Sequence, residues 1–221
     1  MSGGDRGSSV TRGSVVQVVD KQSWPISLSA GDSRSPIHLR PLTRRDRREW
    51  ETVRHANAAY VQRWEPTAPD GVTPRVGFAA YVRGLKREAR AGLIRPWVIE
   101  VDGHLAGQVH LFGIMRGSLL SAAAGYWVAE AFAGRGVATR ALAAVTTYAL
   151  GPFGLHRVEV NIRPENDASL RVVEHLRFRE EGVRERYLHI EGAWRDHRSF
   201  ALTREDTGGM PVIHRWVRTG F

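Results

Sequence analysis

The stretch FAGRGVATRAL (132–142) combines residue types that suit the binding of an anion. Gly134 and Gly136 flank Arg135 directly before an alanine-rich apolar run. Glycine weakens a helix, so its position just before one indicates a backbone that a ligand approaches closely. Unpaired N–H groups and the positive end of the dipole at a helix N-terminus suit phosphates, and Arg135 would add a charge-assisted contact.

This loop is not one of the common nucleotide motifs. No Gly-Lys-Ser/Thr closes it, as a Walker A loop requires, and the Gly-x-Gly-x-x-Gly of a dinucleotide fold is absent. Taken alone, the pattern predicts either a phosphate site or a tight turn that merely starts a helix.

Two further groups of polar residues bear on chemistry. HRVEVNI (156–162) alternates like a strand, so Glu159 and Asn161 share its polar face. Asp196 and His197 are adjacent on a predicted strand and therefore point to opposite faces, which argues against a dyad. The nine histidines show no metal-ligand spacing and the chain has no cysteine, so we expect neither a metal site nor a cysteine nucleophile.

Helix signals occur on both sides of the glycine loop. Thr43 and Asp46 form a capping-box variant for a helix that runs to about Tyr60, and Thr73-Pro74 opens a second helix. Apolar spacing predicts two more helices, over 139–150 and, with Asn166 as the cap, over 167–176.

Strand signals surround these helices. A strand begins near Ile37, and two strands in 97–114 are joined by a turn at Asp102-Gly103. Residues 118–130 form a strand that leads into the glycine loop, and 182–202 form a final hairpin. This order predicts a mixed α/β layered sheet with a strand–helix–strand crossover at its centre.

The ends of the chain differ from its middle. We expect a flexible extension over 1–36 with an accessory strand near 15–19, one domain over 37–203, and a C-terminal tail over 204–221. No apolar run is long enough to cross a bilayer, and the N-terminus lacks the apolar core of a signal peptide, so we expect a cytoplasmic protein without membrane contact. The net charge of +9 indicates either a solvated arginine-rich surface or attraction to an anionic ligand or partner.

Four motifs occur in one order with tight spacing: YWV (126–128), AGRGVAT (133–139), VEVNI (158–162) and NDASLRVVEHLRF (166–178). In this order they resemble the GNAT superfamily of acyl-CoA N-acyltransferases. The WEP of 64–66, the Asn-x-x-Ser of 166–169 and the WRDH of 194–197 resemble more narrowly the RimJ/RimL group of ribosomal-protein alanine N-acetyltransferases. Two positions depart from the family: Ala133 replaces its usual Gln or Arg, and Arg177 replaces the glycine of its Leu-Gly-Phe.

The resemblance implies an α+β fold with a mostly antiparallel, twisted sheet, a splayed central strand pair and helices on both faces. The pantetheine arm of acetyl-CoA would enter the gap and pair with the first splayed strand at Trp127 and Val128. Asn166 would reach the cofactor from the far side of the gap, although capping a helix would also explain it. The diphosphate would bind main-chain N–H groups in the glycine loop and the first helical turn, formed by Gly134, Arg135, Gly136, Val137, Ala138 and Thr139.

The implied reaction is direct attack of an amine on the thioester, with no covalent enzyme intermediate and no metal. Glu159 is the candidate base, with an ion pair to Arg157 or Arg163 as the alternative. Ser169 and Tyr187 are candidates for protonating the thiolate or holding the carbonyl. Ser169 also fits a hydroxyl at a helix start, and Tyr187 an aromatic residue of a hairpin.

The sequence is compatible with three functions. The first is acetylation of the N-terminal α-amino group of a protein such as a ribosomal protein, with association with the ribosome. The second is acylation of a small amine such as an amino acid, a polyamine or an antibiotic. The third is an inactive RNA- or ribosome-binding module, although the basic residues are scattered. Either a monomer or a homodimer is compatible with the sequence.

Overall fold

The computed structural model describes residues 17–18 (main chain only), 23–31, 36–71 and 76–215. Their strands form one nine-stranded sheet in the order β1-β2-β3-β4-β5-β6-β7-β9-β8, in which only the β6–β7 pair is parallel. The strands are β1 (Gln17–Val18), β2 (Leu28–Ala30), β3 (Ile37–Arg40), β4 (Arg95–Val101), β5 (His104–Met115), β6 (Ser121–Val128), β7 (Arg157–Ile162), β8 (Arg179–Ile190) and β9 (Ala193–Thr203).

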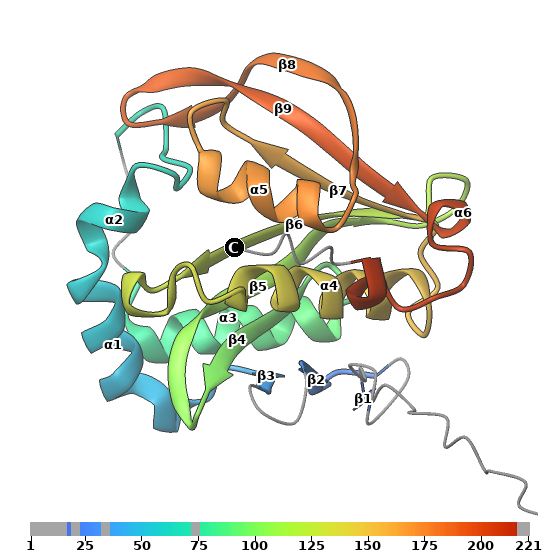
Figure 1. The fold of residues 1–221 in the computed structure, drawn as a ribbon. Helices are drawn as coiled ribbons and strands as arrows, with labels where there is room; N and C mark the ends of the chain where they lie inside the picture. Colours follow the sequence, from blue (N-terminus) through green and yellow to red (C-terminus); the bar gives the residue numbers. More distant parts are fainter. Residues whose placement is uncertain (1–16, 19–22, 32–35, 72–75, 216–221) are drawn as a thin grey trace, which may run out of the picture.

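Helices cover both faces of this sheet, so the expected mixed fold is confirmed. Helices α4 and α5 lie on one face, whereas α1 and α3 lie toward the other (Figure 1). The α-helices are α1 (Arg47–Ala56), α2 (Ala58–Gln62), α3 (Phe78–Arg90), α4 (Val137–Leu150), α5 (Asp167–His175) and α6 (Arg204–Thr207). The 3₁₀ turns in the described part of the chain are η1 (Arg44–Asp46), η2 (Glu130–Phe132) and η3 (Val212–Arg215).

The first predicted helix is interrupted near its end. The capping box of Thr43 and Asp46 is present, but the helix breaks at Asn57 into α1 and α2. The Asn57 amide donates to the carbonyl of Val53 and its oxygen accepts from the N–H of Glu130, so the side chain ties the break to the loop after β6. The predicted Thr73-Pro74 start lies outside the described residues, and α3 begins at Phe78 with Gly77 as its cap.

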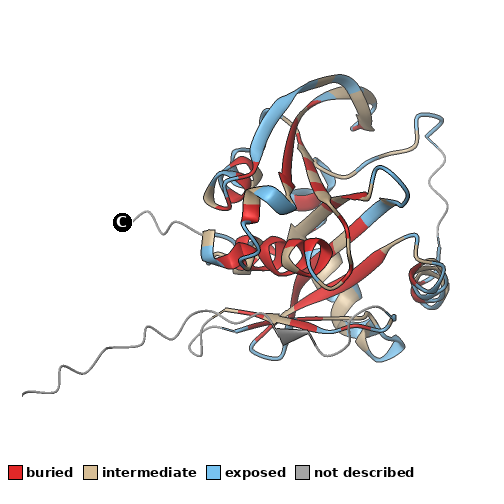
Figure 2. Cartoon of the chain, turned by 90° about the vertical axis from the view of Figure 1, so that its right-hand side faces the viewer, coloured by how far each residue is buried: buried red, intermediate tan, exposed pale blue. Residues whose placement is uncertain are grey.

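Helix α4 forms the centre of the core. Nearly all of its residues are buried, which Figure 2 shows as a red helix against the sheet. Tyr148 of α4 packs edge-on against Trp97 of β4, with ring centroids 5.7 Å apart. This packing fixes the position of α4 and therefore the point at which the glycine loop joins the helix.

Parts of both predicted tails belong to this core. Ile26, Leu28 and Ala30 are buried, and the Trp97 indole donates to the carbonyl of Ile26. Near the C-terminus, Val212 and Ile213 are buried, and the N–H of Val212 donates to the Thr147 hydroxyl of α4. The described parts of the two tails thus pack as extensions of the domain.

The central strand pair separates along its length. Strands β6 and β7 pair only at Ser121 with Arg157, Ala122 with Val158, and Ala123 with Glu159. Beyond Ala123, β6 continues to Val128 paired with β5 alone, and β7 continues to Ile162 paired with β9 alone. The expected splay is confirmed, and one edge of each of these two strands has no partner among the described strands.

Candidate active site

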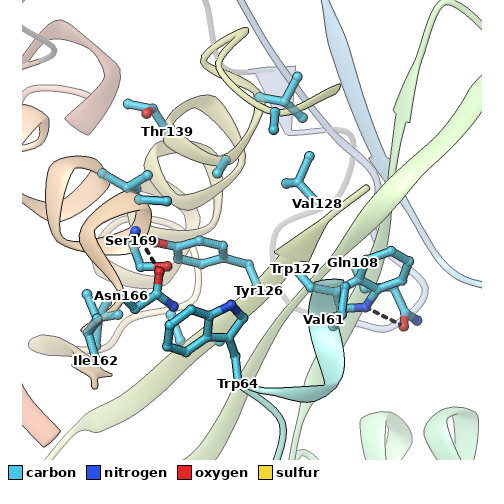
Figure 3. A pocket seen from close by; sticks show the side chains of 18 of the residues that line it. Val61, Trp64, Gln108, Tyr126, Trp127, Val128, Thr139, Ile162, Asn166 and Ser169 are labelled. Carbon is cyan, nitrogen blue, oxygen red and sulfur yellow. Dashed lines mark hydrogen bonds between the residues drawn. The ribbon is translucent and has the colours of Figure 1, made fainter. Parts of the chain in front are cut away.

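A cavity of about 1820 Å³ occupies the splay. Residues of β5, β6, β7, α2, α4, α5, β8 and β9 line it, and Figure 3 shows side chains from several of these elements converging on it. Of the residues predicted to act in the site, all except Glu159 line this cavity.

The glycine loop forms one wall of the cavity. Gly134 and Gly136 both have φ of 70°, in the left-handed region that favours glycine. The first N–H groups of a helix have no intrahelical acceptor, and Gly136, the N-cap of α4, has no side chain that could accept from them. A Cβ at Gly134 would meet nothing within 4 Å, which leaves the loop open to a ligand.

Side chains around this loop hold it in place. The buried Arg140 donates to the carbonyl of Arg135, 2.9 Å away. The exposed Arg135 guanidinium lies 5.3 Å from the centroid of the Phe132 ring and 3.8 Å from the Asp102 carboxylate. Thr139 lines the cavity but is only 3% exposed. The geometry is that of a preformed nest of main-chain donors.

Tyr126 and Ser169 face each other across the splay. The Tyr126 hydroxyl is buried and points toward the hydroxyl of Ser169 of α5, with which it interacts (Figure 3). Burial raises the pKa of the Tyr126 phenol, while the nearby Ser169 hydroxyl opposes that shift. The phenol therefore keeps its proton at neutral pH and is available as a donor.

Asn166 is confirmed as a helix cap. Its side-chain oxygen accepts from the N–H of Ser169 at 3.1 Å, which fixes the start of α5 beside the cavity. Its amide nitrogen is not used in that bond, so a ligand contact is compatible with the cap. Capping and ligand binding are not exclusive at this residue.

Glu159 lies where the strands are still paired, opposite Ala123. Its carboxylate accepts from Arg157 at 2.9 Å and from Arg184 at 2.8 Å, and the residue does not line the cavity. An ion-pair role involving Arg157 was the alternative to catalysis. The geometry favours that role, because each of the two carboxylate oxygens already accepts a hydrogen bond from a guanidinium group.

The opposite side of the cavity is rich in aromatic side chains, and we call it the aromatic chamber. Its residues are Trp64, Tyr81, Gln108, His110, Trp127, Asn161, Tyr187 and His197. The Trp127 indole donates to Gln108 at 3.2 Å. Burial lowers the pKa of His110 to about 4, and its Nε2 has no partner among the described residues.

Sequence reasoning missed several of these residues. Trp64 served only to mark a motif, yet the guanidinium groups of Arg63 and Arg163 lie 4.5 and 5.4 Å from its ring centroid. His197 was set aside with Asp196, and the two do point apart, since Asp196 accepts from the N–H of Arg186 while His197 is buried against the cavity. The alternation of WRDHRS already separated the two faces and could have singled out His197.

The comparisons with known proteins agree with this geometry. Residues 37–179 match the acetyltransferase (GNAT) domain family. The chain belongs to this family. It is therefore an acetyltransferase by family, with the splayed sheet and the glycine loop in the places that the resemblance implied.

Relatives within the family include enzymes that modify ribosomal proteins. The ribosomal protein uS5-alanine N-acetyltransferase of Escherichia coli is 29% identical over 169 residues, which cover 73% of this chain and 85% of that enzyme. A probable N-acetyltransferase of Bacillus subtilis, YjcK, is 39% identical over 105 residues, and the matched region spans only 58% of that protein.

Among solved structures, RimJ of Mycobacterium smegmatis in complex with CoA-disulfide is similar over nearly its whole length. It is 38% identical, with a TM-score of 0.80, and the match covers 87% of this chain and 93% of RimJ. Among the described residues of this chain, no three His, Asp or Glu side chains gather as metal ligands, and no helix has the length and apolarity to span a membrane.

Proposed function

We propose that this family member transfers an acetyl group from acetyl-CoA to the N-terminal α-amino group of a protein, with ribosomal proteins as the acceptor class. The observation that carries the proposal is a single cavity with two unlike ends. One end is a nest of main-chain donors, and the other is the aromatic chamber. The similarity to RimJ and to the uS5-alanine enzyme supports this acceptor class.

The residues present fit coenzyme A. The diphosphate would bind the N–H groups from Arg135 to Thr139, and Arg135 would add a charged contact. The pantetheine arm would pair with the free edge of β6 at Trp127 and Val128, and Asn166 would contact it from α5. Bound acetyl-CoA would supply an activated acetyl thioester at the narrow part of the splay. Because this chain has Ala133 where the family usually has Gln or Arg, one side-chain contact to the diphosphate is missing, but the main-chain donors remain.

The departing thiolate needs a proton. Tyr126 supplies a buried phenol with a raised pKa, and Ser169 stands beside it. We propose that these two hydroxyl groups together deliver a proton to the sulfur. The hydroxyl of Ser169 would connect the Tyr126 phenol to the sulfur. Tyr187 lies in the aromatic chamber beside His197, with ring centroids 5.5 Å apart, so we assign it to the acceptor and not to the sulfur.

The acceptor would enter through the aromatic chamber. An α-amino group has a pKa near 8, so an appreciable fraction is neutral at pH 7. Modification of a ribosomal protein would place the enzyme in the cytoplasm near the ribosome, and the net charge of +9 would speed encounter with an acidic surface.

A peptide assay tests this function. Incubation with acetyl-CoA and peptides that begin with alanine should release free CoA and add one acetyl group at the N-terminus, measured by thiol titration and mass spectrometry. The matched control is the same peptide with a blocked N-terminus, which should not react. Turnover on small amines with none on any peptide would contradict the proposal, and so would an absence of turnover on both.

A further inference from the structure

His197 occupies a distinctive position in the aromatic chamber. It lies on β9 and is 3% exposed, yet it lines the cavity. Ser199, two residues on, donates its hydroxyl to Asn161 of β7 at 2.7 Å, and both line the same face of the sheet. Alternation along β9 therefore directs His197 to the side of the splay where Asn161 lies.

A hydrogen bond fixes which ring nitrogen of His197 carries the proton. Nδ1 lies 3.0 Å from the carbonyl oxygen of Arg195. A carbonyl only accepts, so Nδ1 must carry hydrogen and, in the neutral ring, Nε2 must carry the lone pair. Nε2 makes no hydrogen bond with any residue that the structure describes.

The charges around His197 keep the ring neutral near pH 7. Burial is the main factor that lowers its pKa, and the guanidinium of Arg163, which directly follows β7, acts in the same direction. The Arg195 carbonyl, Asp196 and, more weakly, Glu165 oppose the shift. From β8, Tyr187 packs edge-on against the ring, and the Arg184 guanidinium lies 5.0 Å from the Tyr187 ring centroid.

Other bases near the splay are less suited to accept a proton. Glu159 is held by two arginines outside the cavity, and Glu65 accepts two hydrogen bonds from Arg54 at 2.7 and 2.8 Å. Burial makes His110 a weak base, with a pKa of about 4. His197 combines an available lone pair with a position in the chamber.

We infer that Nε2 of His197 takes a proton from the α-ammonium group of the acceptor, directly or through one water. This inference rests on the proposed function. The neutral amine then forms the C–N bond with the thioester carbonyl, and the C–S bond breaks. The second proton leaves the nitrogen as the sulfur gains one, so amide and thiol are the products. His197 finally releases its proton to solvent.

The test compares His197→Gln with the wild type over a pH series, using an alanine-led peptide and acetyl-CoA. At about pH 7 the variant should lose on the order of 100-fold in kcat. The KM for acetyl-CoA should stay within about twofold, because the nest of main-chain donors is unchanged. The deficit should shrink above about pH 8, where the α-amine is already neutral. The matched control is His55→Gln on the exposed face of α1, which should behave as the wild type.

Two further measurements separate the outcomes. In the wild type, the NMR signals of His197 should show the Nδ1–H tautomer and titrate below the ordinary histidine pKa, a result that does not depend on a folded variant. His197→Asn, which can still donate to the Arg195 carbonyl, should show the same kinetic loss. If the wild type acetylates peptides and both variants keep their rates, the inference on His197 is wrong and the proposed function stands. If the wild type modifies no peptide, both fall.

Discussion

Gly136 illustrates how much of the proposed chemistry depends on single residues. It adopts φ of 70° where α4 begins, and its N–H and those that follow it line the cavity without a side-chain cap. An L-residue in this conformation is strained, and any side chain would project near the donors. Glycine at this position therefore lets the backbone turn into α4 and leaves the N–H groups of the nest open to a ligand.

Gly136→Glu should abolish the binding of CoA. The new carboxylate would stand beside the diphosphate and repel it, so affinity should fall by at least ~100-fold. The matched control is Gly117→Glu, which has the same φ of 70° in an exposed turn away from the cavity. Both variants should lose similar stability, but only Gly136→Glu should lose the calorimetric signal of CoA binding. Equal CoA affinity in the two variants would contradict the role of the nest.

Glu159→Gln should leave turnover within about threefold of the wild type while lowering stability by about 1 kcal/mol. Its carboxylate is only 21% exposed and bonds with Arg157 and Arg184, so the amide would leave part of both guanidinium groups unpaired. Peptide turnover and chemical denaturation measure the two effects. A large loss of kcat at unchanged stability would return Glu159 to the role of base.

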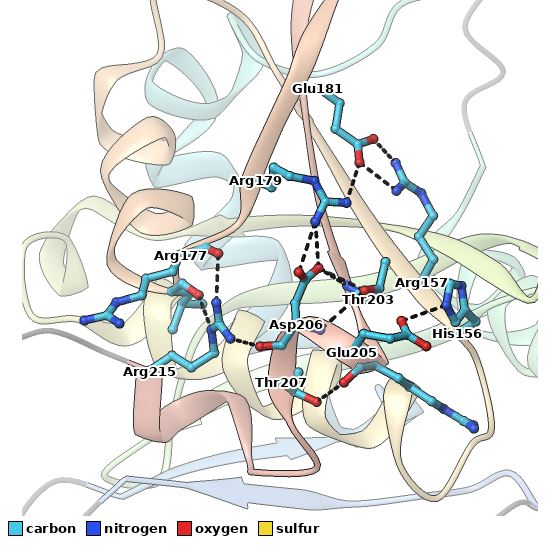
Figure 4. A network of polar contacts seen from close by, with 12 residues as sticks. His156, Arg157, Arg177, Arg179, Glu181, Thr203, Glu205, Asp206, Thr207 and Arg215 are labelled. Atoms are coloured by element: carbon cyan, nitrogen blue, oxygen red, sulfur yellow. Dashed lines mark hydrogen bonds and ion pairs between the residues drawn. The ribbon is translucent and has the colours of Figure 1, made fainter.

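At the scale of elements, the turn that follows α5 contains an arginine in a backbone conformation that favours glycine. Arg177 has φ of 56°, a left-handed conformation at the position where helices usually place glycine. The turn is nevertheless closed, because the N–H of Phe178 donates to Val173 and that of Arg177 to Glu174. Arg215 of the C-terminal segment donates to the carbonyls of Leu176 and Arg177 and so adds support from outside the helix (Figure 4).

Arg177→Gly should therefore stabilise the protein by about 1 kcal/mol, since it removes left-handed strain and keeps the carbonyl that Arg215 contacts. Arg177→Ala is the matched control and should gain little, because alanine keeps the Cβ. Thermal and urea denaturation of both variants check the difference. An equal effect of the two substitutions would show that the strain at Arg177 is not the cause.

The sequence predicted most elements because their signals are local. The capping box at Thr43, the Asp102-Gly103 turn with φ of 51° and 78°, and the alternation of β7 each depend on a few neighbouring residues. The break at Asn57 could not be foreseen, since the Asn57 side chain accepts a hydrogen bond from the N–H of Glu130, which is far away in sequence. The same holds for Glu159, whose partner Arg184 comes from another strand.

Part of the site likewise could not be predicted from the sequence. The donors of the glycine loop are main-chain groups, so their position follows from the loop itself. Tyr126 and His197 lie on different strands, and only the splay and the register bring both to one cavity. Burial by distant elements sets their protonation, which no local pattern contains.

At the scale of the molecule, both ends of the described chain support the domain. We propose that residues 37–203 form the acetyltransferase domain, with 23–31 and 204–215 as integral additions. The C-terminal addition joins a polar network in which Arg179 bridges Glu181 and Asp206, and Arg157 also pairs with Glu181 (Figure 4).

Because of this network, the free energy of unfolding should depend on pH in the acidic range. Hydrogen bonds from Arg157, and also from Arg179, lower the pKa of Glu181 to about 2. A carboxylate with a lowered pKa stabilises the fold fully above its unfolded pKa of about 4.3, and that contribution is lost as the pH falls toward 2. Glu181→Gln should thus be less stable than the wild type near neutral pH, and the difference should vanish at low pH.

Urea denaturation over a pH series measures this effect. Glu185→Gln is the matched control, because Glu185 on the same strand is 74% exposed and its nearest cation, Arg186, is 3.6 Å away. It should follow the wild type at every pH. A difference between Glu181→Gln and the wild type that persists unchanged to low pH would show that ionisation of Glu181 is not its source.

We propose that the nest before α4 and the free edge of β6 bind coenzyme A in this protein, and every catalytic role proposed above depends on that binding. Isothermal titration of CoA into the wild-type chain tests it most directly. We expect saturable heat with one CoA bound per chain. No heat of binding at any accessible concentration, with the protein shown to be folded, would contradict it.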